Sequence, residues 1–214
     1  MGDSTVVDAD LLGIIASGIF LVRLLPQPLR LARTGVSSGV SPLSGIHATI
    51  AAAAWLVYGV EAHLPLVWGV SVAALVPSLW TNALLWRRTT RHDALWGLAW
   101  LVALVGLRSV DLLSAGLAGG VLVTQGPQVR TAVRSDDLGG LAPATWWVSL
   151  ADAASWGAYG WALGDAALLG YAVVLSSCAT IVLVRLRATR DTNRHLRHVV
   201  AVPGAPAGDQ AERS

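Results

Sequence analysis

The sequence contains no lysine, a single cysteine and few charged residues of any kind. Only 13% of its 214 residues are charged, against about 25% in an ordinary soluble domain, and 54% are apolar. The lone Cys178 excludes an internal disulfide. Long windows free of charge reach the roughly 20 residues that a helix needs to cross the hydrocarbon layer. The composition therefore predicts an all-α polytopic membrane protein.

Motifs of other chemistry are missing as well. The sequence has no phosphate-binding loop, no HExxH, no cysteine cluster and no nucleophile elbow. We therefore expect neither an enzyme nor a cofactor or metal site. The 15 basic residues exceed the 13 acidic ones only slightly, and they lie at the ends of apolar runs. The basic pI is thus no sign of a nucleic-acid partner, and the expected surroundings are the lipid bilayer.

Apolar runs predict seven membrane spans, at residues 9–31, 41–60, 64–86, 94–110, 111–133, 141–163 and 166–184. If the loops are assigned alternately to the two sides, thirteen of the 15 arginines fall on one side and only Arg108 on the other. Arginine accumulates on the cytoplasmic side of membrane proteins. The pattern predicts a multi-pass protein of the cell membrane, with its N-terminus outside and its C-terminus in the cytoplasm.

An internal repeat appears when the chain is shifted by 101 residues. The matches need no gap, and they are Pro26–Gln27 with Pro127–Gln128, Arg33 with Arg134, Gly39 with Gly140, Pro42 with Pro143, Trp55 with Trp156, and Tyr58–Gly59 with Tyr159–Gly160. Two copies of a three-helix unit are predicted, at 9–86 and 111–187, preceded by an external segment at 1–8. Residues 87–110 form a cytoplasmic loop and an unpaired linker helix, which gives both copies the same direction. The Arg-rich and then Pro/Gly/Ala-rich tail at 188–214 is predicted to be disordered.

The paired Pro-Gln motifs in a three-plus-one-plus-three arrangement resemble the SWEET and PQ-loop transporter superfamily, over about residues 9–187. The resemblance implies uniport of mono- and disaccharides, or proton-coupled transport of amino acids as in other branches. It implies bending of helices at four prolines, Pro26, Pro42, Pro127 and Pro143, and a central cavity with Trp55 and Trp156. The positions of the family's sugar-binding asparagines fall near Val70 and Ala172, beside Ser71 and Tyr171, and neither is asparagine.

Proline has its own physical meaning within an apolar helix. It removes a backbone donor and frees a carbonyl, so the helix can kink there, and in lipid the freed group needs a partner. The side-chain amides of Gln27 and Gln128, each next to a proline, can donate a hydrogen bond to such a freed carbonyl or to another helix. The four prolines and two glutamines are therefore candidates for a hinge that opens one end of a pathway. The alternative is that each proline merely ends a span.

Aromatic residues in the outer halves of two spans are candidates for solute binding. Trp55 and Trp156 lie about 7 to 10 Å below the predicted outer surface, deeper than interfacial tryptophans usually lie. Tyr58 and Tyr159 follow them three residues later in both copies. An indole face can stack on a sugar ring or a cation. Ordinary helix packing is the alternative.

Three polar residues interrupt the apolar spans and have no equivalent in the other copy: Arg23, His47 and Asp152. Intramembrane charges are costly and are functional candidates by default. The depths of Arg23 and Asp152 are compatible, so we expect them to pair across the two copies. Such a pair is either an ion pair that locks the bundles or a proton- or charge-coupled site, and Arg23 reaching out to the cytoplasm is a third possibility.

Three hypotheses of function follow from these features. The first is a SWEET-like uniporter of a small solute, most simply a sugar, which works by alternating access. The second is a proton-coupled transporter of an amino acid or another charged solute, for which Asp152 and Arg23 are the expected binding groups. The third is a membrane receptor or assembly factor that transports nothing. A homo-oligomer is possible, although two bundles in one chain suffice for a pathway.

Overall fold

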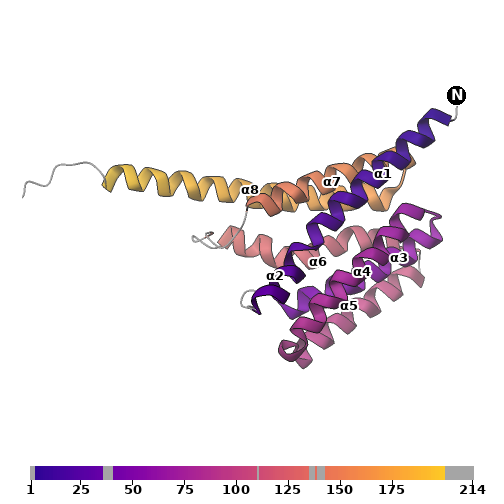
Figure 1. The fold of residues 1–214 in the computed structure, drawn as a ribbon, viewed down its shortest axis with the longest axis horizontal. Helices are drawn as coiled ribbons and strands as arrows, with labels where there is room; N and C mark the ends of the chain where they lie inside the picture. Colours follow the sequence, from indigo (N-terminus) through magenta and orange to yellow (C-terminus); the bar gives the residue numbers. More distant parts are fainter. Residues whose placement is uncertain (1–2, 36–40, 110, 135–137, 139–142, 201–214) are drawn as a thin grey trace, which may run out of the picture.

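The computed structural model describes residues 3–35, 41–109, 111–134, 138 and 143–200. Throughout this part of the chain the regular structure is helical, and no strand occurs in it. The helices are α1 (Asp3–Leu24), α2 (Pro26–Thr34), α3 (Pro42–Glu61), α4 (Pro65–Leu85), the short 3₁₀ helix η1 (Trp86–Arg88), α5 (Arg91–Ser109), α6 (Leu113–Arg134), α7 (Pro143–Leu163) and α8 (Ala166–Val200). Figure 1 shows them stacked side by side, with α8 projecting beyond the others at one end.

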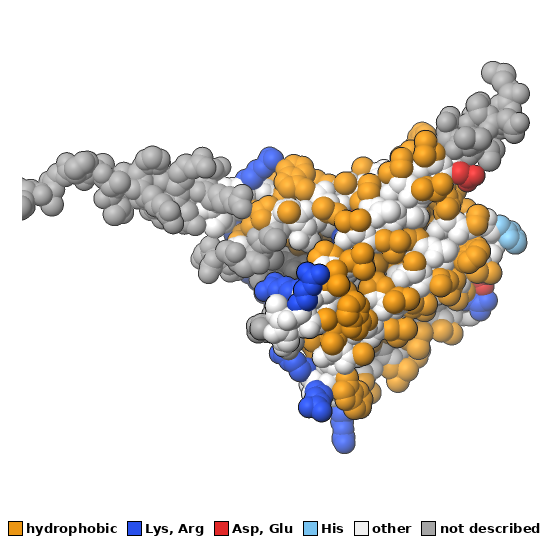
Figure 2. Space-filling view, in the orientation of Figure 1, with side chains coloured by type: hydrophobic (Ala, Val, Ile, Leu, Met, Phe, Trp, Pro, Cys, Tyr) orange, Lys and Arg blue, Asp and Glu red, His pale blue; other side chains and the backbone are white. Residues whose placement is uncertain are grey.

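Four helical segments of the described chain are long and apolar enough to cross a membrane: Ala9–Thr34, Pro42–Glu61, Pro65–Arg88 and Ala166–Thr189. Leu113–Gly126 is a shorter apolar helix. Hydrophobic side chains cover much of the visible face between the two ends (Figure 2). These features fit a membrane protein, as the composition predicts.

The helices pack in a regular pattern. The helices form two groups. In the first group α4 packs against α1, α2 and α3, and in the second α8 packs against α6 and α7. Contacts between these two groups run from α1 to α7 and from α3 to α6. Helix α5 lies against α3 and α6 (Figure 1). Helices α1 and α3 of the first group thus contact α7 and α6 of the second group, while α4 and α8 each pack within their own group.

Two interhelical turns have the same geometry at positions 101 residues apart. His63 ends the turn between α3 and α4 at φ 54°, and Gly164 does so between α7 and α8 at φ 70°. In each turn the next residue donates its N–H to a glycine carbonyl, Leu64 to Gly59 and Asp165 to Gly160, both at 2.8 Å. This is the hydrogen-bond pattern that closes a helix through a left-handed residue.

The same two glycines allow close helix contacts. A Cβ on Gly59 would lie 2.7 Å from the Trp68 backbone nitrogen, and one on Gly160 would lie 2.7 Å from Leu168 Cβ. Both distances are far below ordinary contact. Glycine is therefore required at these positions because the following helix turns back directly against them.

The two Pro-Gln motifs differ in their effect on the backbone. Leu25 interrupts the first span, which divides into α1 and α2, whereas α6 continues through Pro127 without a break. The first motif contains a second proline, Pro28, so two of three consecutive residues lack an N–H donor there, against one in α6. Pro42 and Pro143 instead open α3 and α7, where the N–H that proline lacks would have no helical partner.

Helix α8 corrects one expectation about the C-terminal part. The tail was predicted to be disordered from residue 188, but α8 continues to Val200, so that prediction is wrong for 188–200. Neither proline nor glycine occurs between Tyr171 and Val202, and nothing in this stretch stops the helix before Pro203. Residues 201–214 of the predicted tail lie outside the described part of the chain.

The two ends of the molecule differ in charge. Basic side chains gather at the end from which α8 projects, and acidic side chains lie at the opposite end (Figure 2). The acidic end includes Glu61, which is paired with Arg108 through a hydrogen bond of 2.8 Å from Nε. We call the end from which α8 projects the arginine end, and the opposite end, which includes Glu61, the acidic end.

Candidate functional site

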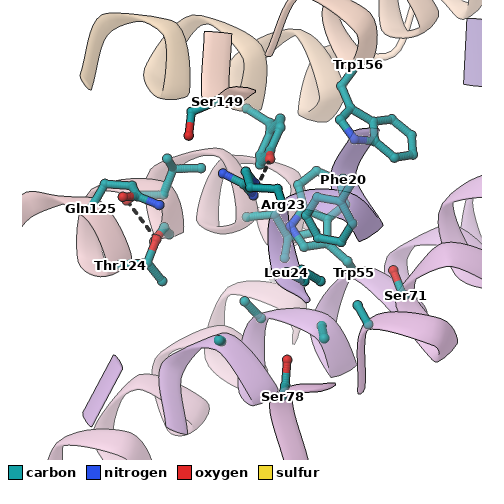
Figure 3. A pocket seen from close by; sticks show the side chains of 18 of the residues that line it. Phe20, Arg23, Leu24, Trp55, Ser71, Ser78, Thr124, Gln125, Ser149 and Trp156 are labelled. Carbon is teal, nitrogen blue, oxygen red and sulfur yellow. Dashed lines mark hydrogen bonds between the residues drawn. The ribbon is translucent and has the colours of Figure 1, made fainter. Parts of the chain in front are cut away.

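A cavity of about 580 Å³ lies among the helices α1, α3, α4, α5, α6, α7 and α8. Tryptophan and aliphatic side chains form much of its wall, together with small hydroxyl-bearing residues and one arginine. Figure 3 shows Arg23, Phe20 and Trp55 near its middle, with Trp156 and Ser149 across from Ser71 and Ser78. The volume is in the range of small-molecule sites.

Residues related by the 101-residue repeat line the cavity together. Eight such pairs occur in its wall: Phe20 with Val121, Arg23 with Thr124, Leu24 with Gln125, Ser44 with Thr145, Ala48 with Ser149, Trp55 with Trp156, Val67 with Leu168, and Val70 with Tyr171. Residues that lie 101 positions apart in the sequence therefore face the same space.

Arg23, Tyr171 and Asp152 form a connected polar cluster at the wall. Nη2 of Arg23 donates to the Tyr171 hydroxyl at 3.1 Å, and that hydroxyl donates to Oδ2 of Asp152 at 2.6 Å. Nη2 of Arg23 also lies 3.4 Å from the same Oδ2. The predicted pairing of Arg23 with Asp152 is thus present. Tyr171, which the sequence places beside an expected asparagine position, completes it.

Burial within the cluster is uneven. The Asp152 side chain has no exposed surface, whereas that of Arg23 is 14% exposed and belongs to the cavity wall. Nε of Arg23 and Oδ1 of Asp152 are buried without a hydrogen-bond partner among the described residues. The Trp156 side chain, one helical turn along α7, is a further neighbour of the carboxylate. A solute in the cavity would therefore meet the arginine and the tyrosine, with the carboxylate behind them.

The cavity is closed toward the acidic end. There the Tyr58 hydroxyl of α3 donates to Oδ2 of Asp165 at 2.6 Å, and Oδ1 of Asp165 caps α8 by accepting from Leu168 N at 2.8 Å. Trp55 packs edge-on against Tyr58 and Tyr171, with ring centroids 5.7 and 5.8 Å apart. At the arginine end the wall includes Ser41, an exposed residue at the start of α3. The cavity thus extends toward the arginine end.

Trp55 and Trp156, the predicted stacking residues, both line the cavity. Tyr58 and Tyr159 do not. They lie about one turn nearer the acidic end, Tyr58 in its bond to Asp165 and Tyr159 only 2% exposed against Trp156. Their position makes them part of the closure beyond the cavity.

The predicted hinge residues lie near the arginine end. Pro26 is exposed at the first position of α2, while Pro42 and Pro143 begin α3 and α7. The side chains of Gln27, Pro127 and Gln128 lie outside the described part of the structure. The predicted partners of the two glutamine amides therefore remain predictions.

His47, the third unpaired polar residue, does not line the cavity. It is 7% exposed on α3, and its Nε2 has no hydrogen-bond partner among the described residues. Asn82 on α4 is also turned away from the cavity, because its amide donates to the Gly45 carbonyl at 3.2 Å and to Thr49 Oγ1 at 2.7 Å. Within the described residues no group of three or more histidine, cysteine or acidic side chains is placed to hold a metal ion.

Small hydroxyl residues of the wall are absent from the sequence-based candidates. Ser149 and Thr145 lie seven and eleven residues before Trp156, on the same face of α7, and Ser44 has the place of Thr145 in α3. The spacing i, i+4, i+11 marks one face of a helix. These residues could have been predicted from the sequence by following the helix face that carries Trp55 or Trp156 back to the start of its helix.

Comparison of the sequence with protein-family models and with curated proteins finds no match.

Proposed function

We propose that the chain is a multi-pass membrane transporter that moves a small solute by alternating access between two three-helix bundles, as in the SWEET-like family that its motifs resemble. The observation that carries the proposal is the cavity wall, in which eight pairs of repeat-related residues face one space. A pathway on the axis between two equivalent halves can open to either side when the halves tilt, while the site between them stays in place.

The helix contacts support the three-plus-one-plus-three arrangement. In this proposal the first bundle consists of α1 with α2, α3 and α4, the second of α6, α7 and α8, and α5 is the linker. The contacts from α1 to α7 and from α3 to α6 are equivalent under exchange of the two copies. Helix α5 has no counterpart, and it lies against both α3 and α6.

The charge distribution supports an orientation with the arginine end in the cytoplasm and the N-terminus outside. In that orientation the bond between Tyr58 and Asp165 closes the cavity on the outside, and its exposed end at Ser41 faces inward. The helix break at Leu25, beside Pro26, lies near the inner end, where a hinge would widen or narrow the opening.

Two solute classes are candidates for this cavity. A sugar fits the indole pair of Trp55 and Trp156, which can stack on a ring. A charged solute with proton coupling is favoured by one specific observation, the cluster of Arg23, Tyr171 and Asp152 at the cavity wall. The expected asparagine positions near Val70 and Ala172 carry no asparagine, and Val70 and Tyr171, the neighbour of Ala172, stand in the wall.

Solute counterflow in proteoliposomes tests the proposal. Purified protein is reconstituted with an excess of unlabelled glucose, L-alanine or pyruvate inside, at equal pH on both sides, and entry of the same labelled solute is followed. We expect transient accumulation of at least one of them, and its loss in Trp156→Ala. Trp161→Ala is the matched control, since this tryptophan of the same helix is 79% exposed and outside the cavity. Folded protein that exchanges none of the three would favour the non-transporting receptor and overturn the proposal.

A further inference from the structure

The cavity wall has one ionised side chain among its described residues, and it is positive. Of the lining residues that the structure describes, Arg23 alone is an arginine, histidine or acidic residue. Its surroundings are the Phe20 ring, 5.3 Å from Cζ, and a wall of indoles, aliphatic groups and small hydroxyls. In such low-dielectric surroundings a fixed cation attracts an anionic group strongly.

The arginine also has donors to spare. A guanidinium carries five N–H donors in a planar fork, and the described contacts of Arg23 use only Nη2. Its Nε is buried and has no partner among the described residues. Nε and a terminal nitrogen together form the fork that binds both oxygens of a carboxylate.

Asp152 supplies the second half of the argument. Its side chain is fully buried, and its described countercharge is Arg23. A carboxylate that loses its countercharge inside a protein is costly, and it becomes neutral by taking up a proton. Whatever draws the guanidinium away from Asp152 therefore makes this carboxylate a proton acceptor.

We propose that the cavity takes up a small monocarboxylate together with one proton: the solute carboxylate replaces Asp152 as the partner of Arg23, and Asp152 becomes protonated. This inference rests on the proposed transport function and names its substrate class. The charges balance, because an anion of charge −1 and one proton enter and leave together. Transport is then electroneutral, and it is driven by a pH difference.

Tyr171 provides the route for the proton. Its hydroxyl lies at the cavity wall and donates to Oδ2 of Asp152 at 2.6 Å. An excess proton that arrives from solution through the cavity water passes to the tyrosine oxygen, while the tyrosine passes its own proton to the carboxylate. When the solute leaves, the reverse transfer returns the proton to water and Arg23 pairs again with Asp152.

Other titratable groups near Asp152 do not take this role. Among the described side chains of the helices packed on α7, α1 carries Asp10 besides Arg23, and α8 carries Cys178, Arg185 and Arg187 besides Tyr171. Asp10 lies near Tyr159 at the acidic end, Arg185 donates to the Ala132 carbonyl and Arg187 covers the Trp147 ring. The groups that interact with the Asp152 carboxylate are Arg23, Tyr171 and the indole of Trp156, and of these the indole does not titrate.

A zwitterionic amino acid suits this wall less well than a plain carboxylate. Its ammonium group would need an anionic acceptor facing the solute, and the described lining contains no carboxylate. Asp152 lies behind Tyr171 and does not reach the cavity surface. The hydroxyl groups of Ser149 and Thr124 suit a keto or hydroxyl substituent on the solute.

The test uses the full chain in proteoliposomes with labelled pyruvate, and glucose and L-alanine beside it. We expect saturable pyruvate uptake that rises when the outside is acidified and does not respond to a potential imposed with valinomycin. Glucose or alanine exchange without pyruvate exchange would overturn the inference and leave the transport function standing. Absence of exchange for all three solutes would instead remove the transport function itself. Pyruvate flux that follows the potential would refute the paired proton.

Variants separate the two roles. Asp152→Asn removes the proton acceptor, so accumulation of pyruvate should no longer respond to the pH difference. Arg23→Gln should weaken pyruvate binding about tenfold to a hundredfold, the loss of a charge-assisted hydrogen-bonded contact, and Arg23→Lys should restore part of it. Arg30→Gln, on the exposed face of α2, is the control. If Arg23→Gln does not fold, the double variant with Asp152→Asn removes the unpaired charge and still reports on pyruvate binding. Unchanged pyruvate affinity in that double variant would overturn the inference.

Discussion

Replacement of Arg23 by glutamine tests how strongly the ion pair stabilises the fold. The variant leaves the fully buried Asp152 with its Tyr171 hydrogen bond and no countercharge. Loss of one partner of a buried pair costs about 3–5 kcal/mol, because the remaining charge is desolvated without compensation. For a chain of this size each kcal/mol lowers Tm by about 2–4 °C, so the expected fall is about 6–20 °C.

The assay is thermal unfolding in detergent for the two single variants, Arg23→Gln and Asp152→Asn, and for the double variant. The double variant has no unpaired charge, so its loss of stability should be smaller than the sum of the single losses by about 1–3 kcal/mol. The deficit of Arg23→Gln should also shrink as the pH falls, since protonation of Asp152 removes the unpaired charge. Additive losses that do not depend on pH would refute the reasoning, and exposed Arg30→Gln should leave Tm unchanged.

Three further predictions concern parts of the fold away from this pair. Gly160→Ala should lower Tm, because the new Cβ meets a neighbouring helix at 2.7 Å, whereas Gly119→Ala, with nothing within 4 Å, should not; equal effects would contradict the close contact. Tyr58→Phe removes the bond to Asp165, so hydrogen exchange at the turns of the acidic end should rise about tenfold or more; unchanged exchange would mean that this bond does not hold the turns together. The backbone N–H and the hydroxyl of Thr90 donate to the Asp93 carboxylate and lower its pKa. These bonds stabilise the start of α5 at any pH above the ordinary pKa of aspartate, and this stabilisation is lost as the pH falls through the lowered pKa. Amide exchange there should increase at acidic pH in the wild type, and Asp93→Asn should show the higher rate already at neutral pH.

The sequence predicts those features of the fold that follow from local pattern. Helices α3 and α4 begin and end within a residue or two of the predicted spans, because Pro42 and Pro65 open them and the turn with the left-handed His63 separates them. The 101-residue shift leads directly to equivalent turns and to the paired wall of the cavity. The pairing of Arg23 with Asp152 could be predicted from the depth of each residue in its span, because the rise per residue of a helix is fixed.

Features that depend on the neighbourhood of a residue were harder to predict. The break at Leu25 and its absence in α6 depend on Pro28, which has no counterpart in the second motif. Tyr171 was known only as a neighbour of an expected asparagine position. Its role as the bridge between Arg23 and Asp152 depends on side-chain direction, which spacing along one helix does not give.

The polar cluster has no equivalent among the residues that the 101-residue shift relates to it. The residue 101 positions from Arg23 is the neutral Thr124, that of Tyr171 is Val70, and that of Asp152 is Ala51. A solute that both halves bind in the same way requires no charged cluster on one side only. A solute with one charged end does require it.

The placement of the cluster also matters for movement. In the proposed arrangement Arg23 belongs to the first bundle and Asp152 and Tyr171 to the second. The helices that carry Arg23 and Asp152, α1 and α7, form one of the two contacts between the bundles. An ion pair across this contact stabilises one relative position of the bundles. A carboxylate that takes over the arginine loosens that contact at the moment it binds, so binding of the solute and movement of the bundles become a single linked equilibrium.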